Sequence, residues 1–140
     1  MVGDFGWASS PALHFGIGKR SLIAPLAASF GERLIFVLGG QSFVNSSYWS
    51  ELQQACEEQH LKWKITHIIG EPSPTMIDTC VEQYRDWGPQ LIVAIGGGSA
   101  LDAGKAIAAM FTETEGVKQF LEGVGSGKPS GRTLPFIAVP

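Results

Sequence analysis

The sequence predicts an α/β domain built on an open, mostly parallel sheet with helices on both of its faces. Four short runs are almost continuously apolar or β-branched, which is typical of parallel strands covered on both sides. Segments with apolar residues at helical spacing separate these runs, and this alternation indicates right-handed βαβ units. The chain has 140 residues, of which 44% are hydrophobic and 16% charged. We therefore expect residues 1–140 to form a single domain.

The expected strands follow from the positions of the apolar runs. They cover residues 33–38, 64–69, 91–95 and 135–139. A shorter run, ALHF at 12–15, predicts an edge strand. The last run stops at Pro140 with no turn or cap after it. Because a core strand seldom closes a complete domain, we expect the chain to be part of a longer protein.

Helical patterns lie between the strands. Residues 19–31 predict a helix that Pro25 kinks or starts late. In residues 47–61 and 73–88, apolar side chains recur at helical spacing, with charged residues on the other faces. A Gly-Pro pair ends the second of these patterns.

Composition and charge exclude several classes of protein. The formal net charge is −3 and the sequence has no basic face, so neither a nucleic acid nor a membrane is expected as a partner. The N-terminus lacks the features of a secretion signal, and no apolar run is long enough to cross a bilayer. Cys56 and Cys80 form no C-x-x-C pair and are expected in the core. We expect a reducing compartment, hence a cytoplasmic location.

The most informative stretch consists of Gly96, Gly97, Gly98 and Ser99, between an apolar strand and a helix expected from near Ala100. In open α/β sheets, ligands bind beyond the carboxyl ends of the strands. The start of a helix there offers unpaired N–H groups and a partial positive charge, which attract phosphate. Glycine lets a phosphate approach these N–H groups closely. The stretch therefore predicts a phosphate-binding loop.

Other motifs could explain the glycine-rich segments of the chain. A plain strand-to-helix turn would use Ser99 as N-cap and Asp102 to close a capping box, and it is compatible with phosphate binding. A dinucleotide G-x-G-x-x-G or a nucleophile elbow G-x-S-x-G would need glycine where Leu101 stands. A P-loop at 123–130 fails because Pro129 replaces the serine or threonine after the lysine.

The stretch GGGSALDAGKAIA, residues 96–108, resembles the G-G-G-S-x-x-D-x-x-K-A-I-A signature of the iron-containing (group III) alcohol dehydrogenases. The segments FGIGKRS, EPSP and LPFIAVP resemble further family segments in the same order, so the resemblance covers the whole chain. It implies a Rossmann-like, dehydroquinate-synthase-like N-terminal domain. It also implies that this domain binds a nicotinamide dinucleotide, which exchanges hydride with an alcohol or aldehyde in the family.

The resemblance assigns roles to residues of the loop. Gly97, Gly98 and Ser99 would contact the cofactor pyrophosphate, and Asp102 would lie near the nicotinamide side of the pocket. From the residues alone, Asp102 is explained equally well as a capping acid, and Lys105 as its i, i+3 ion-pair partner.

The end of the strand at 33–38 indicates which dinucleotide is bound. Many family members place an aspartate there, which accepts hydrogen bonds from the adenosine ribose, whereas this chain has Gly39, Gly40, Gln41 and Ser42. Without the carboxylate, a 2′-phosphate is not repelled and finds N–H and hydroxyl donors. We therefore expect NADP(H) to be favoured over NAD(H), although no Arg or Lys follows closely. A glycine turn of no further significance is the alternative.

Two further features have structural explanations. The EPSP segment resembles the E-P-x-P loop of the family, in which Ser73 could contact the cofactor. Pro72 and Pro74 indicate instead an extended strand exit and a helix start, and we prefer this structural role. Gly104 inside a helix indicates close packing against the sheet or the ligand.

Family chemistry uses a divalent metal, iron or zinc, held by an aspartate and histidines of the C-terminal half. His14, His60 and His67 do not match those ligands, so we expect neither a metal site nor a catalytic residue in this chain. The chain alone should be inactive on the alcohol or aldehyde substrate. A homo-oligomer is compatible with the sequence. The alternatives are a non-catalytic nucleotide-binding module and a piece of a related glycerol dehydrogenase or dehydroquinate synthase.

Overall fold

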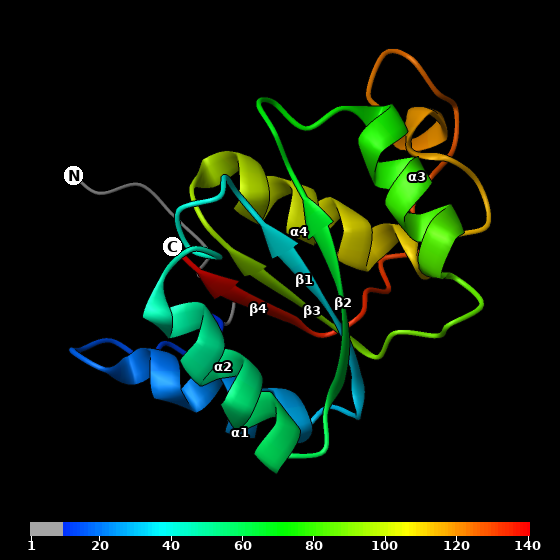
Figure 1. The fold of residues 1–140 in the computed structure, drawn as a ribbon. Coiled ribbons are helices and arrows are strands. Elements are labelled where there is room, and N and C mark those ends of the chain that lie inside the picture. The colour runs from blue at the N-terminus through cyan, green and yellow to red at the C-terminus, as the bar shows by residue number, and fades with distance from the viewer. Residues whose placement is uncertain (1–9) are drawn as a thin grey trace, which may run out of the picture.

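A four-stranded parallel sheet forms the centre of the fold (Figure 1). The computed structural model describes residues 10–140. Its strands follow the spatial order β2-β1-β3-β4, and every neighbouring pair is parallel. The strands are β1 (Arg33–Leu38), β2 (Lys62–His67), β3 (Leu91–Ile95) and β4 (Phe136–Val139).

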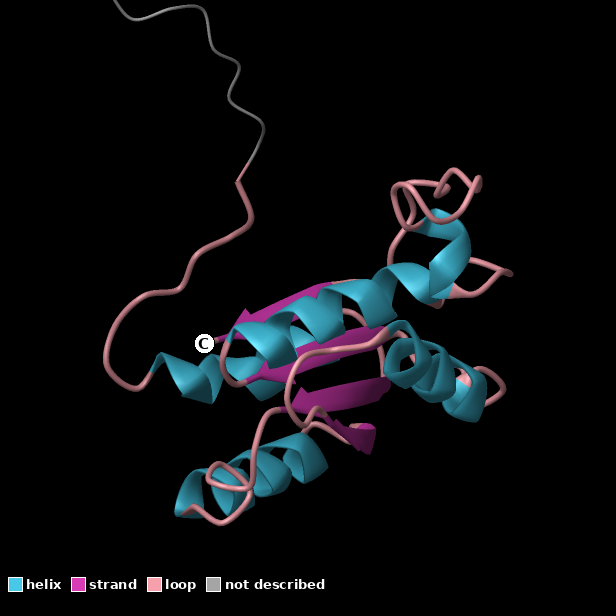
Figure 2. Ribbon diagram, turned by 90° about the horizontal axis from the view of Figure 1, so that it is seen from above, coloured by secondary structure: helices cyan, strands magenta, loops and turns pink. Residues whose placement is uncertain are grey.

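Helices cover both faces of this sheet (Figure 2). On one face lie α1 and α2, and on the other lie α3 and α4. The α-helices are α1 (Ile23–Ala28), α2 (Ser47–Glu58), α3 (Pro74–Tyr84) and α4 (Gly98–Met110). Two short 3₁₀ helices, η1 (Lys19–Leu22) and η2 (Val117–Phe120), precede α1 and follow α4.

The two-residue period of a strand divides the core into two layers. In β1, Leu34, Phe36 and Leu38 pack beneath α1 and α2, whereas Ile35 and Val37 pack beneath α3 and α4. All five side chains are at most 1% exposed. A strand that is buried on both faces must be apolar throughout, which explains the continuous run RLIFVL.

The structure confirms the expected fold class and four of the expected strands. The ranges 33–38 and 91–95 agree with β1 and β3, and β4 begins at Phe136, one position later than expected. The edge strand β2 begins at Lys62 and not at residue 64. An edge strand tolerates polar side chains, so its start is not marked by an apolar run in the sequence.

The expected edge strand at 12–15 is wrong. This segment has no regular secondary structure, and Leu13 and Phe15 are 84% and 91% exposed. Within residues 10–140 it hydrogen-bonds to no strand, and an extended run without a partner forms no ladder.

The helices lie where they are expected, but they are shorter than the expected ranges. The helix at 19–31 starts late, as expected: α1 begins at Ile23 and holds Pro25 in its first turn, where no intrahelical N–H bond is lost. The helix expected at 47–61 is α2, which ends at Glu58. The helix expected at 73–88 is α3, which ends at Tyr84. No helix in the described part of the chain is long and apolar enough to span a membrane.

Both cysteines are buried, as expected. Cys56 is part of α2 and packs into one core layer, and Cys80 is part of α3 and packs into the other. Burial, together with the charge of Glu57, raises the pKa of the Cys56 thiol to about 11. Burial also raises the pKa of Cys80. Both act as small core residues.

Candidate functional site

The chain reverses its direction across the sheet between β1 and β3. From β1 it passes through α2 on one face to reach β2, and from β3 it passes through α4 on the other face to reach β4. The segments that follow β1 and β3 therefore diverge to opposite faces at the carboxyl edge of the sheet. Ligands of open α/β sheets bind at such a switch point.

Both glycine segments predicted to bind a cofactor begin at this switch point. The N–H of Gly39, directly after β1, donates to the carbonyl of Ile95 at 3.1 Å. Gly96, directly after β3, has a φ of +144°, which favours glycine. A Cβ on Gly96 would lie 3.2 Å from the nitrogen of Gly39 and 3.1 Å from the Cβ of Ala100. Only glycine at position 96 allows this close approach.

The first turn of α4 leaves part of its backbone open at this edge of the sheet. Gly97 is the N-cap of α4 and Gly98 its first residue, and both are exposed. Within residues 10–140, the N–H groups of Gly97, Gly98 and Ser99 donate to no protein acceptor. A Cβ added to Gly97 or Gly98 would have no neighbour within 4 Å. The start of α4 is therefore uncrowded, and its unpaired N–H groups are the kind that bind anions at helix N-termini.

The alternative of a capping box formed by Ser99 and Asp102 is wrong. Because α4 begins at Gly98 and not near Ala100, Ser99 lies inside the helix, and no side chain caps the N-terminus. Asp102 pairs with Lys105 instead, at 3.6 Å between Oδ1 and Nζ, which confirms the expected i, i+3 ion pair. Both side chains are more than half exposed, so this pair contributes little to stability.

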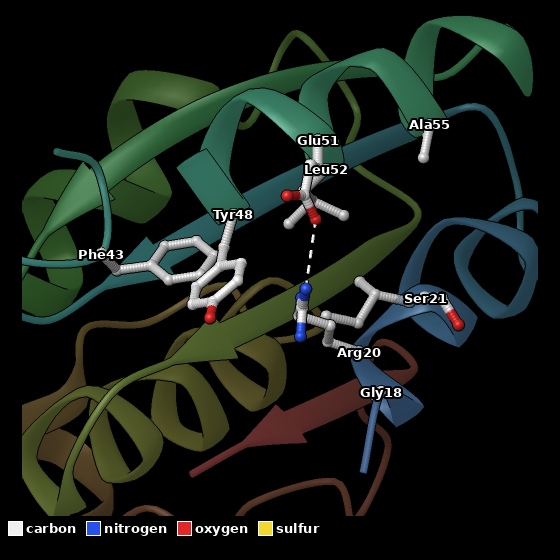
Figure 3. Close-up of a pocket in the computed structure, with 9 residues that line it drawn as sticks. Gly18, Arg20, Ser21, Phe43, Tyr48, Glu51, Leu52 and Ala55 are labelled. Atoms are coloured by element: carbon white, nitrogen blue, oxygen red, sulfur yellow. Dashed lines mark hydrogen bonds and ion pairs between the residues drawn. The ribbon is translucent and has the colours of Figure 1, made fainter. Parts of the chain in front are cut away.

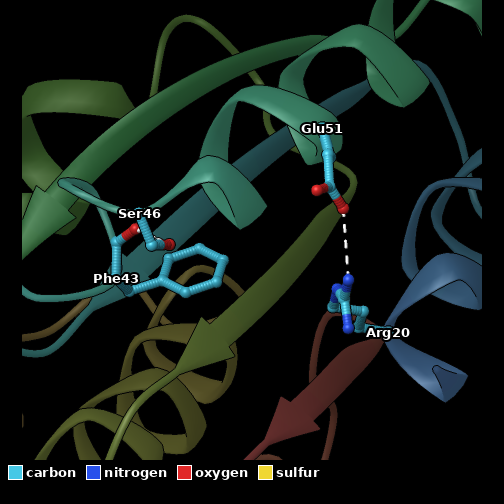
Figure 4. Close-up of polar contacts among 4 residues, drawn as sticks. All are labelled: Arg20, Phe43, Ser46 and Glu51. Carbon is cyan, nitrogen blue, oxygen red and sulfur yellow. Dashed lines mark hydrogen bonds and ion pairs between the residues drawn. The ribbon is translucent and has the colours of Figure 1, made fainter. Parts of the chain in front are cut away.

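The segment after β1 is an exposed turn. Gly40, Gln41 and Ser42 are exposed, and a Cβ on Gly40 would meet nothing within 4 Å. The turn is closed by the N–H of Asn45, which donates to the carbonyl of Gln41 at 3.0 Å. The Ser46 hydroxyl donates to the carbonyl of Phe43 at 2.6 Å (Figure 4). The N–H and hydroxyl groups predicted for cofactor binding are therefore accessible.

An arginine that the sequence did not indicate, Arg20, lines the same cavity as Phe43. A cavity of about 180 Å³ separates η1 and α1 from α2 and is lined by Phe43 and Tyr48 (Figure 3). The Arg20 guanidinium lies 3.9 Å from the centre of the Tyr48 ring. Its Nη2 is 3.2 Å from Oε2 of Glu51. No sequence signal links Arg20 to the turn, because the two are joined only by the packing of α1 on α2.

The EPSP segment has the expected structural role at the start of α3. The Ser73 hydroxyl accepts from the N–H of Met76 at 3.3 Å as the N-cap, and Pro74 is the first helical residue. Gly104 packs against the sheet, since an added Cβ would lie 2.6 Å from the Cβ of Ala94. Both features stabilise the fold.

The histidines lie apart from one another in the chain and none is buried. His14 lies in an irregular segment, His60 follows α2 with a φ of 57°, and His67 ends β2. In the described range, 10–140, no group of three His, Cys, Asp or Glu side chains is arranged to hold a metal ion.

Comparisons with known proteins show which family the chain resembles. The sequence model described as "Iron-containing alcohol dehydrogenase" matches residues 10–140. The chain belongs to this family. It corresponds to the N-terminal region of iron-containing alcohol dehydrogenases.

Curated relatives of this iron-containing alcohol dehydrogenase chain are considerably longer. A probable alcohol dehydrogenase of Escherichia coli, EutG, is 35% identical over 131 residues, which are 93% of this chain and 32% of that protein. NADH-dependent butanol dehydrogenase B of Clostridium acetobutylicum is 27% identical over 107 residues, or 76% of this chain and 27% of that protein. The chain thus spans about a third or less of the length of these relatives.

Solved structures of the family confirm the fold. Sulfoacetaldehyde reductase from Bifidobacterium kashiwanohense, solved in complex with NAD⁺, superposes with a TM-score of 0.76 at 24% identity, over 97% of this chain and 35% of that one. NADH-dependent butanol dehydrogenase A from Thermotoga maritima gives a TM-score of 0.76 at 19% identity, over 96% of this chain and 34% of that one.

The glycine segments at this edge of the sheet have two of the features that a dinucleotide requires. A diphosphate needs several free N–H donors, and within residues 10–140 the N–H groups of exposed Gly97, exposed Gly98 and partly exposed Ser99 donate to no protein acceptor. A ribose needs room beside the neighbouring strand, and the open backbone at Gly40 provides it. The described residues provide no comparable set of ligands for iron or zinc.

Proposed function

We propose that residues 1–140 form the dinucleotide-binding domain of an alcohol dehydrogenase that exchanges hydride between a nicotinamide cofactor and a small alcohol or aldehyde. In this proposal Gly96, Gly97, Gly98 and Ser99 hold the cofactor pyrophosphate. The observation that carries the proposal is the row of N–H groups from Gly97 to Ser99, which bond to no acceptor within residues 10–140 and lie at the switch point of the sheet.

The part of this chain in the reaction is to bind and orient the cofactor. The amides at the start of α4 neutralise the diphosphate, and the helix dipole adds to that attraction. Asp102 lies one turn further along α4 and is exposed, so it can face the nicotinamide side of a bound dinucleotide. When bound, the nicotinamide ring supplies the hydride donor or acceptor.

We propose further that NADP(H) is favoured over NAD(H). The support comes from Gly39, Gly40 and Ser42, which leave an open turn without a carboxylate at the end of β1. Two relatives are named for NADH dependence, so this preference rests on the residues of the turn and not on the comparisons.

The metal-dependent steps belong to a part of the enzyme outside this chain in this proposal. The residues described here hold no metal-ligand cluster, and the chain covers only a fraction of the length of its relatives. The 140-residue chain alone is therefore expected to bind cofactor and to convert no alcohol or aldehyde.

Titration calorimetry of NADPH against the chain and its Gly98→Val variant tests the pyrophosphate assignment. A Cβ at Gly98 meets no protein atom within 4 Å, so the variant should fold and its side chain should occupy the space of the diphosphate. We expect binding to weaken at least about tenfold. Unchanged NADPH binding by a folded variant would refute the assignment, and an unchanged unfolding temperature is the control for folding.

A further inference from the structure

We infer that Arg20 is the residue that distinguishes NADP(H) from NAD(H), by pairing with the 2′-phosphate of the adenosine ribose. This inference rests on the proposed function. A 2′-phosphate requires a cation, and none is encoded near the turn, because residues 39–61 contain no lysine or arginine. The fold supplies one from an earlier segment.

The course of the chain places Arg20 at the carboxyl edge of the sheet. η1 and α1 run back along the sheet before the chain enters β1 at Arg33. Four 3₁₀ residues and six α-helical residues rise by about 17 Å, close to the length of the six-residue strand β1 at about 3.3 Å per residue. Arg20 near the start of η1 is therefore level with the end of β1, where Gly39 lies.

The contacts of Arg20 place it on the same face as the turn. Its guanidinium stacks on Tyr48 in the first turn of α2. Phe43, the residue after Ser42, lines the same cavity as Arg20 and Tyr48 (Figure 3). Arg20 thus lines the same cavity as Phe43, the residue that directly follows the predicted ribose-binding turn.

The present partner of Arg20 can be displaced. Glu51 holds one guanidinium nitrogen, and the two side chains are 46% and 58% exposed (Figure 4). An ion pair this exposed contributes little, whereas a phosphate offers a doubly charged, bidentate partner. The Tyr48 ring keeps the planar guanidinium in place during such an exchange. Glu51 therefore competes with the 2′-phosphate for the same cation.

Calorimetric dissociation constants for NADPH and NADH in four variants test this inference. Arg20→Ala should weaken NADPH binding about tenfold, the value of a charge-assisted contact, and change NADH binding less than about twofold. The NADPH dissociation constant of Arg20→Lys should lie between those of Arg20→Ala and the unmodified chain, since lysine keeps the charge but lacks the two parallel N–H donors of the guanidinium. Glu51→Gln should tighten NADPH binding about two- to fivefold. Lys19→Ala, on the same 3₁₀ helix, is the control and should change neither constant.

The outcomes separate the inference from the proposed function. Equal effects of Arg20→Ala on both dinucleotides, or no effect on either, would overturn the role of Arg20 while leaving the binding site intact. A chain that binds neither dinucleotide would overturn the proposed function and this inference with it. A selective loss of NADPH binding, matched by a gain in Glu51→Gln, supports both.

Discussion

Gly39 and Gly96 are in direct contact across the carboxyl ends of β1 and β3. The Gly39 N–H donates to the carbonyl of Ile95 at 3.1 Å, and a Cβ on Gly96 would lie 3.3 Å from the Gly39 Cα. Two segments that are far apart in the sequence thereby form one continuous backbone surface. The proposed cofactor site depends on this contact, and the following predictions test it and the packing around it.

Replacing Gly96 with alanine should destabilise the fold. The residue has a φ of +144°, and the added Cβ would press on Gly39 and on Ala100. We expect a loss of about 1–3 kcal/mol in the free energy of unfolding, measured by chemical denaturation. Gly97→Ala is the matched control, because its φ is −74° and its Cβ has open space. Equal stability of the two variants would contradict the contact described above.

Introducing a carboxylate at the end of β1 should change cofactor preference. The Cβ of a Gly39→Asp variant would make only ordinary contacts, with Gly96 at 3.7 Å and Ala100 at 3.8 Å. The carboxylate would accept hydrogen bonds from a ribose and repel a 2′-phosphate, so the ratio of the NADPH and NADH dissociation constants should shift about tenfold or more toward NADH. Gly39→Asn, which lacks the charge, should shift it less. An unchanged ratio in Gly39→Asp would show that this position does not face the ribose.

Gly104→Ala should lower stability although alanine is the better helix former. The helix propensity would gain about 1 kcal/mol. The new Cβ would lie 2.6 Å from the Cβ of Ala94, which cannot rotate away, and 2.8 Å from the Phe136 ring. Overpacking of this kind costs about 1–3 kcal/mol and should outweigh the gain. Unfolding by denaturant measures the difference, with Lys105→Ala as an exposed control; a Gly104→Ala variant that is more stable than the parent would contradict the close packing.

The loop at 122–133 should loosen in acid. The hydroxyl and the N–H of Ser130 both donate to Oε1 of Glu113, at 2.6 and 2.8 Å, and hold the pKa of that carboxyl below its ordinary value. Because this pKa is lowered in the folded state, the contribution of the contact is complete above the unfolded pKa of about 4.3 and is lost as the pH falls through the folded pKa. An NMR titration of the Glu113 carboxyl should give a midpoint below that of the Ser130→Ala variant. Equal midpoints would contradict the contact.

Local chemistry was sufficient to predict the central strands and the glycine loop. Strands β1 and β3 are buried on both faces, so their apolar runs identify them without knowledge of their neighbours. The glycines at 96–98 were predicted to lie at a strand end, and the structure places them there. That they bind a pyrophosphate remains a prediction.

Features that depend on distant partners could not be predicted in this way. The run at 12–15 has the composition of a strand, but strand formation requires a partner edge, and none is present within residues 10–140. The start of α4 was misplaced because Ser99 is a common N-cap, whereas the backbone continues the helix back to Gly98. Arg20 was missed because only the packing of α1 against α2 brings it to the cavity.

An NMR titration of the ¹⁵N-labelled chain with NADPH tests the central claim most directly, because it reports on the backbone amides themselves. If the start of α4 holds the diphosphate, the amide resonances of Gly97, Gly98 and Ser99 should shift strongly and saturate with the same dissociation constant as calorimetry gives. Shifts confined to other parts of the chain, with these three amides unchanged at saturation, would contradict the account.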